Sequence, residues 1–495
     1  MRALRGSSIL LRRGVSSSAR ADATEPPHID DAIARFRHVG GTSNLALGAV
    51  RWQPPVDTSS FLSSSSSSSP PAAWSRYGDV HGLRELRDAL LARHGLPPVP
   101  DDDAGGGGGG VGVTVTAGAN QAFVNVALAC LDPEDRVVLC APYYFSHLAA
   151  LQLAGGHVEV APFHQGTMQP DEAYVCRLLE EASAASSSSA SPSQAPVKMV
   201  VLTTPNNPSG CVVEAWRIEA LVEACRRHGA WLVVDEAYEH FTFDGAAHFD
   251  FDALQHQHQH QHHSLATLSP SSDGQSRHFH DARDVLVRLH TLSKSLGMAG
   301  WRCGYVLYPQ RSLGRAMTKV QDAIPTHCSI ASQRIALEAL ANAYDDYPEE
   351  EEEEEAKATP SHWVARQVSE LEPCREVLWG AVEQTGAVRT DGAFYFLVPL
   401  PPAWRVFDSG DSSSSSSSLG RCRKAERAVM LEAAALKVLG ERFKVVVTPG
   451  SAFGCTGFFR ASYGSLPNDQ LAVAAQRLND GLAWLAQNNP PPGLL

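Results

Sequence analysis

The sequence predicts an α/β protein with a mostly parallel β-sheet, and three kinds of segment support this fold class. Short runs at 199–203 and 231–234 are apolar almost throughout, as expected of parallel strands that are buried on both faces. Another such run, at 111–115, leads through a glycine turn into an apolar, helix-forming stretch at 121–131. Polar residues follow the runs directly, which is typical of the ligand-binding edge of an open α/β sheet.

Length and charge favour a large enzyme-sized protein with two domains. The chain has 495 residues, of which 43% are hydrophobic, enough for a substantial core. No apolar stretch approaches the ~20 residues that cross a membrane. The formal charge is −13, but three aspartates at 101–103 and seven glutamates at 349–355 account for −10 of it. The remainder is nearly neutral, so we expect no nucleic-acid or membrane partner.

The first 25 residues predict an organelle transit peptide. The segment contains several arginines and serines, and no acidic residue precedes Asp22. The mitochondrion is the first expectation, with the plastid and the cytoplasm as alternatives. A disordered basic N-terminus without a targeting role is the competing interpretation.

Low-complexity segments interrupt the chain between its motifs. Such compositions cannot bury apolar surface, so we expect them to be exposed and mobile. Alternating histidines in one tract could bind a metal, but low-complexity expansion is the favoured interpretation. Ten cysteines without CxxC pairs indicate neither a zinc site nor disulfides, so we predict reduced thiols and no metal. The segments are 63–69, 105–110, 183–194, 255–263, 349–355 and 412–418.

The turn after the strand at 111–115 has the composition of an anion site. It contains Gly118, Ala119 and Asn120, directly before the helical stretch. Free backbone N–H groups and the helix dipole at such an N-terminus favour a phosphate. We therefore predict that these three residues form a phosphate cradle.

Two further strands end in polar side chains. Asn207 follows the strand at 199–203, in a turn that two prolines and a glycine make rigid. Asp235 follows the strand at 231–234 directly, at the edge where open α/β sheets bind ligands. The alternatives are a plain turn for Asn207 and a helix N-cap for Asp235.

One lysine and two arginines add reactive and anion-binding groups. Lys294 lies between two serines, beyond the apolar run at 285–287, a setting that suits a buried amine able to attack carbonyls. Arg302, eight positions later, offers a planar fork for two phosphate oxygens. Arg460 follows two phenylalanines at the end of a predicted strand. A surface lysine and a surface ion pair are the alternatives for Lys294 and Arg302.

The ordered set of motifs resembles the class I and II aminotransferases, fold type I enzymes that use pyridoxal 5′-phosphate. The resemblance runs from about residue 40 to about residue 485. It implies a mostly parallel seven-stranded sheet in a large domain, a smaller α+β domain, and the cofactor between them. The implied boundaries are 26–75 and 335–495 for the small domain and 76–334 for the large one. The motifs are Asn207 in Asn-Pro-Ser-Gly, Asp-Glu-Ala-Tyr at 235–238, Ser293-Lys294, Arg302 and Phe459-Arg460-Ala461-Ser462-Tyr463.

The resemblance implies catalytic roles for Lys294, Asp235 and Tyr238. Lys294 would hold the cofactor aldehyde covalently and then shuttle the proton of the substrate α-carbon. Asp235 would keep the cofactor ring nitrogen protonated. Asn207 and Tyr238 would donate to the ring's phenolate oxygen. The amino group would pass to a 2-oxo acid through pyridoxamine phosphate.

Further cofactor contacts are implied by the same resemblance. Arg302 and Thr291 would join the cradle at Gly118, Ala119 and Asn120 in binding the phosphate. Tyr144 would stack on the cofactor ring, although core packing is an alternative. Tyr77 matches a tyrosine that reaches the phosphate of the neighbouring subunit, so a homodimer is expected.

Gly48, Trp52, Asn207 and Arg460 are the predicted substrate contacts. Arg460 would hold the substrate α-carboxylate, and the backbone of Gly48 would lie near the substrate. The segments at 48–55, 116–125, 142–145 and 320–325 are similar to plant aminotransferases that act on aromatic amino acids or methionine. Trp52 would then stack on the substrate ring near the entrance, although a structural role is equally compatible.

Two other functions share this scaffold. A pyridoxal-phosphate-dependent C–S lyase or cyclopropane-forming synthase would need the same lysine, aspartate and arginine. A non-catalytic binding scaffold is the third hypothesis, and the full set of cofactor residues argues against it.

Overall fold

The computed structural model describes residues 18–24, 33–58, 74–100, 110–184, 195–253, 284–344, 362–406 and 418–491. Apart from a few end residues, the low-complexity segments lie outside these ranges. Residues 1–17 and 25 of the predicted transit peptide also lie outside them.

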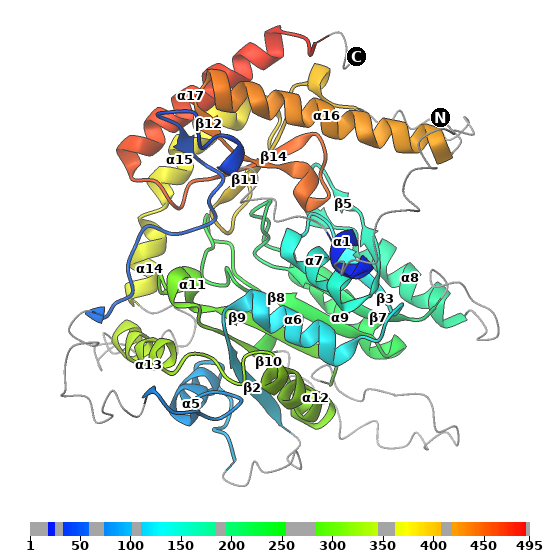
Figure 1. The fold of residues 1–495 in the computed structure, drawn as a ribbon, viewed down its shortest axis with the longest axis vertical. Coiled ribbons are helices and arrows are strands. Elements are labelled where there is room, and N and C mark those ends of the chain that lie inside the picture. The colour runs from blue at the N-terminus through cyan, green and yellow to red at the C-terminus, as the bar shows by residue number, and fades with distance from the viewer. Residues whose placement is uncertain are drawn as a thin grey trace, which may run out of the picture.

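A seven-stranded sheet forms the centre of the larger part of the molecule (Figure 1). Its order is β2-β10-β9-β8-β7-β3-β4, and β10 alone runs antiparallel to its neighbours. The prediction of a mostly parallel seven-stranded sheet is therefore confirmed. The strands are β2 (Val111–Thr116), β3 (Arg136–Cys140), β4 (His157–Ala161), β7 (Val197–Thr203), β8 (Trp231–Asp235), β9 (Leu286–Thr291) and β10 (Gly304–Pro309).

Helices cover both faces of this sheet, because most of its strands are apolar on both sides. Phe123 and Val233 belong to one buried hydrophobic cluster, and Leu221 and Val234 belong to another. The first face carries α6 (Ala119–Cys130), α7 (Phe145–Ala154) and α12 (Gln310–Ala323). The second carries α8 (Glu172–Ala184) and α9 (Ala215–His228), while α5 (Arg84–Arg93) and α13 (Ile330–Tyr344) pack against each other near β2.

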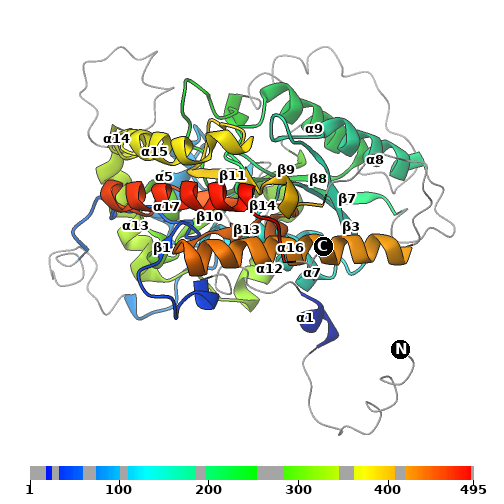
Figure 2. The ribbon, with the colours of Figure 1, turned by 90° about the horizontal axis from the view of Figure 1, so that it is seen from above.

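The smaller part of the molecule combines the two ends of the chain. Ser43 of β1 (Ser43–Asn44) pairs with Val445 of β12 (Val445–Val446), so the N-terminal segment joins the C-terminal region. Long helices lie side by side across it in both ribbon views (Figures 1 and 2). Its sheet is β11 (Tyr395–Pro399), β14 (Phe458–Ser462) and β13 (Thr448–Pro449); its helices are α14 (His362–Ser369), α15 (Glu372–Val382), α16 (Ser418–Arg442) and α17 (Asn468–Gln487). The predicted domain boundaries themselves stay a prediction.

Short elements complete the chain. A five-residue helix, α1 (Ala19–Ala23), falls within the predicted transit peptide, and its Arg20 Nη1 donates to the carbonyl oxygen of Leu153 at 3.2 Å. Within the described ranges, no helix combines the length and apolarity needed to span a bilayer. The others are β5 (Phe163–His164), β6 (Gln169–Pro170), α11 (Leu292–Ser295), and the 3-10 turns η3 (Ala299–Trp301), η4 (Glu383–Thr385), η5 (Pro402–Trp404) and η6 (Gly450–Phe453).

A buried ionic network holds β8 and β9 together beside the ligand-binding edge. Arg288 donates from Nε to Glu236 and from Nη1 to Asp252, each at 2.6 Å. Burial alone would raise the pKa of Glu236, but the charge of Arg288 and the neighbouring histidines lower it below its usual range. Successive side chains of a strand point to opposite faces, so the anchored Glu236 leaves Asp235 facing the other way.

Candidate active site

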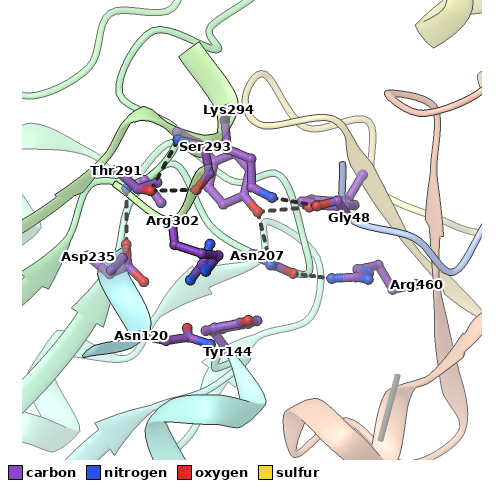
Figure 3. Close-up of a pocket in the computed structure, with 14 residues that line it drawn as sticks. Gly48, Asn120, Tyr144, Asn207, Asp235, Thr291, Ser293, Lys294, Arg302 and Arg460 are labelled. Carbon is purple, nitrogen blue, oxygen red and sulfur yellow. Dashed lines mark hydrogen bonds between the residues drawn. The ribbon is translucent and has the colours of Figure 1, made fainter. Parts of the chain in front are cut away.

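A pocket lies at the carboxyl edge of the central sheet, where it faces the smaller part of the molecule (Figure 3). The parallel strands β7, β8 and β9 end there, which brings together residues far apart in the chain. Of the sequence-predicted site residues, all but Gly118, Trp52 and Tyr77 line it. The lining residues are Gly48, Ala119, Asn120, Tyr144, Asn207, Asp235, Ala237, Tyr238, Thr291, Ser293, Lys294, Arg302, Tyr395 and Arg460.

Lys294 reaches the pocket from the short helix α11, directly after β9. The helix begins here because the Thr291 hydroxyl accepts a hydrogen bond from the Ser293 N–H at 3.2 Å and caps it. The Lys294 Nζ donates to the carbonyl oxygen of Gly48. Burial, with the positive charges of Arg460 and Arg302, lowers the pKa of Lys294 to about 8. A substantial share of this amine is therefore neutral, and nucleophilic, near physiological pH.

This lowered pKa gives a pH-dependent prediction. A lysine of ordinary pKa becomes nucleophilic only around pH 10.5, whereas the neutral fraction of Lys294 should rise through about pH 8. We expect the rate at which pyridoxal phosphate adds to the cofactor-free protein to rise with a midpoint near pH 8. Stopped-flow absorbance across pH 6.5–11 measures it, and a midpoint near 10.5 would contradict the assigned environment.

Asp235 is held in one orientation by two neighbours. It is 4% exposed, and its Oδ1 accepts from the Ala237 N–H at 3.0 Å. Its Oδ2 lies 3.0 Å from His147 Nε2. The His147 ring, on the first turn of α7, packs 4.3 Å from that of Phe123. Sequence reasoning missed His147; its position three residues after Tyr144, on the same turn of a helix, was the available signal.

A closed chain of contacts links the two sides of the pocket. Asn207 Nδ2 donates to the Tyr238 hydroxyl at 3.2 Å, and the Tyr238 and Tyr395 hydroxyls lie 2.8 Å apart. Arg460 Nη1 donates to Asn207 Oδ1 at 2.8 Å, and its guanidinium lies 4.4 Å above the Tyr395 ring. Burial raises the pKa of Tyr238 well above its usual value and that of Tyr395 to about 12. Both hydroxyls therefore stay protonated at neutral pH.

Tyr395 was not predicted as a site residue. It belongs to β11 in the smaller part of the molecule, 157 positions from the tyrosine it contacts. A strand rich in aromatic residues carries no local sign that one of them faces a pocket. Its hydroxyl also explains Gly48, because a Cβ on Gly48 would lie 2.6 Å from it.

Arg460 is a buried cation that points into the pocket. It is fully buried in β14, and its Nη2 donates to the carbonyl oxygen of Ala46 at 2.7 Å. Within the described part of the chain, no carboxylate forms an ion pair with it. A buried charge without a counter-ion is costly, so this arrangement favours an anionic ligand.

Another end of the pocket combines a helix N-terminus with an arginine, a combination that suits an anion. Gly118 is the N-cap of α6, and Ala119 and Asn120 follow it at the pocket wall. Arg302 Nη2 donates to the carbonyl oxygen of Ala117 at 2.8 Å and lies against this helix N-terminus. Gly118 has a φ of +84°, and a Cβ there would lie 2.6 Å from Arg302 Nη2, so both backbone and space require glycine. Gly118 thus leaves room for the Arg302 side chain beside the predicted cradle.

Besides Gly118, two predicted residues do not line the pocket. Trp52 is 8% exposed and stacks on Phe241 at a centroid distance of 6.0 Å. The ring belongs to the core, as the structural alternative for Trp52 expects, and its predicted contact with the substrate stays a prediction. Tyr77 is 89% exposed, and its ring meets His327 edge-on at 5.9 Å.

The donor set of the pocket fits pyridoxal phosphate. Lys294 supplies an amine for the aldehyde, and Asp235 a buried carboxylate for the ring nitrogen. Protonated Tyr238 and Asn207 offer donors for the phenolate oxygen. The N-terminus of α6 and Arg302 suit the phosphate. Arg460 remains for a further anion.

The comparisons with known proteins agree with this geometry. A family profile described as "Aminotransferase class I and II" matches residues 69–478. The "Aromatic aminotransferase ISS1" of Arabidopsis thaliana is 29% identical over 94% of this chain and 96% of its own. A "Probable aspartate/prephenate aminotransferase" of Thermus aquaticus is 26% identical over 87% and 90%.

A solved structure shares the fold. The Thermus thermophilus aspartate aminotransferase with maleate superimposes with a TM-score of 0.65 at 24% identity, over 95% of this chain and all of its own. The family match covers both parts of the molecule and every residue of the pocket wall except Gly48. The chain therefore belongs to the class I and II aminotransferases, enzymes that transfer amino groups with pyridoxal 5′-phosphate.

Proposed function

We propose that the protein transfers the α-amino group of an aromatic amino acid, or of methionine, to a 2-oxo acid. The proposal is supported by the number of cationic side chains in the pocket wall, because each of them already has a partner. Lys294 serves the cofactor aldehyde, Arg302 the phosphate and Arg460 the α-carboxylate. No other Lys or Arg lines the described pocket to hold a side-chain carboxylate, whereas Tyr144, Tyr238 and Tyr395 offer aromatic surface.

The relatives are divided on this point. One carries the name aromatic aminotransferase, and others are named as aspartate or aspartate/prephenate aminotransferases. The balance of charge in the described wall supports the first of these. A dicarboxylate would place a second negative charge where this chain alone offers no counter-ion.

Pyridoxal phosphate, when bound, supplies the electron-withdrawing ring that stabilises negative charge at the substrate α-carbon. In the proposed mechanism, Lys294 would hold the cofactor, and its Nζ would take the proton from the substrate α-carbon. Asp235 would keep a proton on the ring nitrogen, and the contact with His147 fixes the direction of that carboxylate. Asn207 and Tyr238 would donate to the phenolate oxygen.

Arg460 orients the substrate in this mechanism. Its guanidinium is already fixed by Asn207, Ala46 and the Tyr395 ring, so little side-chain entropy remains to be lost on binding. A carboxylate held there keeps the α-carbon near Lys294. The contact between Asn207 and Arg460 joins substrate binding to the phenolate end of the cofactor site.

A screen of amino donors tests the proposed specificity. With one common 2-oxo acid acceptor, kcat/KM for phenylalanine, tyrosine, tryptophan or methionine should exceed that for aspartate by at least about tenfold. Coupled detection of the new amino acid measures it. A preference for aspartate would refute the aromatic assignment and leave amino-group transfer itself intact.

We further propose a homodimer in which Tyr77 completes the phosphate site of the partner subunit. The support is the high exposure of Tyr77, an aromatic side chain that this chain alone leaves in solvent. Tyr77→Phe should weaken cofactor retention several-fold in dialysis and leave the native mass dimeric. Retention equal to wild type, or a monomeric wild type, would contradict this assignment.

Mitochondrial import is a separate proposal, which the arginine-rich and serine-rich N-terminus supports. Residues 1–30 fused to a fluorescent protein should direct it to mitochondria. Fluorescence in plastids or throughout the cytoplasm would favour one of the alternatives.

A further inference from the structure

A buried glutamate outside the pocket has neutral hydrogen-bond partners. Glu432 lies in α16 and is 1% exposed. Ser451 donates to it from its backbone N–H at 3.2 Å and from its hydroxyl at 2.5 Å. The Gly457 N–H donates to its Oε2 at 2.8 Å. In the described ranges, no arginine, lysine or histidine pairs with this carboxylate. Burial of a carboxylate without a positively charged partner costs free energy, which indicates that Glu432 has a specific role.

The partners of Glu432 are the two ends of one turn. Residues 450–457 connect β13 to β14, and Ser451 and Gly457 lie near its beginning and its end. The Glu432 carboxylate therefore connects the two ends of this turn through hydrogen bonds. In register, Thr448 of β13 stands opposite Arg460 of β14, so the turn sets how these two strands meet at the arginine.

The turn also contacts the pocket arginine directly. The ring of Phe453, within the turn, lies 5.1 Å from the Arg460 guanidinium. The Phe453 carbonyl oxygen accepts from the Tyr143 N–H at 3.3 Å, next to the pocket residue Tyr144. The turn thus contacts α16, Arg460 and, at Tyr143, the larger part of the molecule.

We propose that Glu432 is a positioning residue, which holds the turn at 450–457 so that Arg460 presents its guanidinium to the substrate carboxylate. The inference rests on the proposed role of Arg460 and adds a residue that touches neither substrate nor cofactor. Its action passes through Ser451, Gly457 and Phe453. Groups that act through a pocket residue in this way tune affinity rather than supply chemistry.

The protonation state of Glu432 should make substrate affinity depend on pH. Burial raises the pKa of Glu432 to about 7, although the hydrogen bonds from Ser451 and Gly457 oppose the rise. A protonated carboxyl group carries an O–H donor, which would face the donors of Ser451 and Gly457 instead of accepting from them. The contact between Glu432 and the turn at 450–457 would therefore weaken. Among the described residues, the other ionisable groups nearby are the Cys455 thiol and Arg405, whose side chain lies against Gly457. Substrate affinity should therefore fall as the pH drops through about 7.

Binding of 3-phenylpropionate, a carboxylate without an amino group, to the purified holoenzyme tests the proposal. For Glu432→Gln we expect Kd to rise about tenfold at pH 8, with unchanged cofactor content by absorbance. Ser451→Ala should shift Kd less, in the same direction. Glu441→Gln, which removes an exposed charge of the same helix, is the matched control and should bind like wild type. In wild type, Kd should also rise as the pH falls from 8 to 6, and this step should be absent in Glu432→Gln.

Several outcomes separate the alternatives. A lower melting temperature with unchanged Kd in Glu432→Gln would make the residue merely structural and overturn the proposal. If Glu432→Gln does not fold, Ser451→Ala and the wild-type pH profile decide; unchanged affinity in both would also overturn it. Arg460→Ala is measured in parallel. Unchanged binding there would refute the proposed role of Arg460, whereas a loss there with none in Glu432→Gln would refute only the present inference.

Discussion

Replacement of Lys294 by alanine should abolish amino transfer, with kcat reduced by at least about 10⁴-fold. The variant loses both the amine that holds the cofactor and the base that takes the α-proton. In the described part of the chain, the Lys294 side chain has one hydrogen bond, to Gly48, so its removal should change the free energy of unfolding little. Single-turnover absorbance with phenylalanine and thermal unfolding measure the two quantities.

The control is Lys319→Ala, which removes an exposed lysine of α12 and should leave activity unchanged. Lys294→Arg keeps a positive charge but cannot condense with an aldehyde at neutral pH. It should therefore be as inactive as the alanine variant. Residual turnover within about tenfold of wild type in either variant would contradict the assignment of Lys294.

Arg460→Ala should raise KM for amino acid donors about 100-fold or more. Hydrogen bonds to charged groups contribute about 1.5–3 kcal/mol each, and a bidentate carboxylate would lose two of them. Stability should fall as well, because Asn207 and Ala46 lose buried partners. Steady-state kinetics with phenylalanine, with the cofactor saturating, measure KM and kcat separately.

Arg302→Ala provides the matched comparison. It removes the other arginine of the pocket, at the α6 end. This variant should lose cofactor on dialysis, with substrate KM near wild type once cofactor is saturating. Arg460→Ala should show the reverse pattern. If both variants lost the same function, the separate assignment of the two anion sites would be wrong.

Strand composition made the core of the fold predictable. The apolar runs at 199–203 and 231–234 correspond to β7 and β8, and the run at 111–115 to β2. Hydrophobicity on both faces is a local property, so sequence reveals it. The reversed β10 between β2 and β9 was not predicted, because strand order depends on long-range pairing.

The predicted site residues divide in the same way. Those at or shortly after strand ends, such as Asn207, Asp235 and Lys294, could be placed at one sheet edge. Tyr395 and His147 were missed because their contacts depend on how distant elements pack. The Trp52 ring stacks on Phe241, a contact between distant segments that a sequence motif does not reveal, and its predicted contact with the substrate stays a prediction.

The most direct test is borohydride reduction of the holoenzyme, followed by proteolysis and mass spectrometry of the peptides. We expect one pyridoxyl-phosphate group per chain, on the peptide that contains Lys294. No fixed cofactor, or a label on a different lysine, would contradict the central claim that Lys294 of this pocket carries the coenzyme.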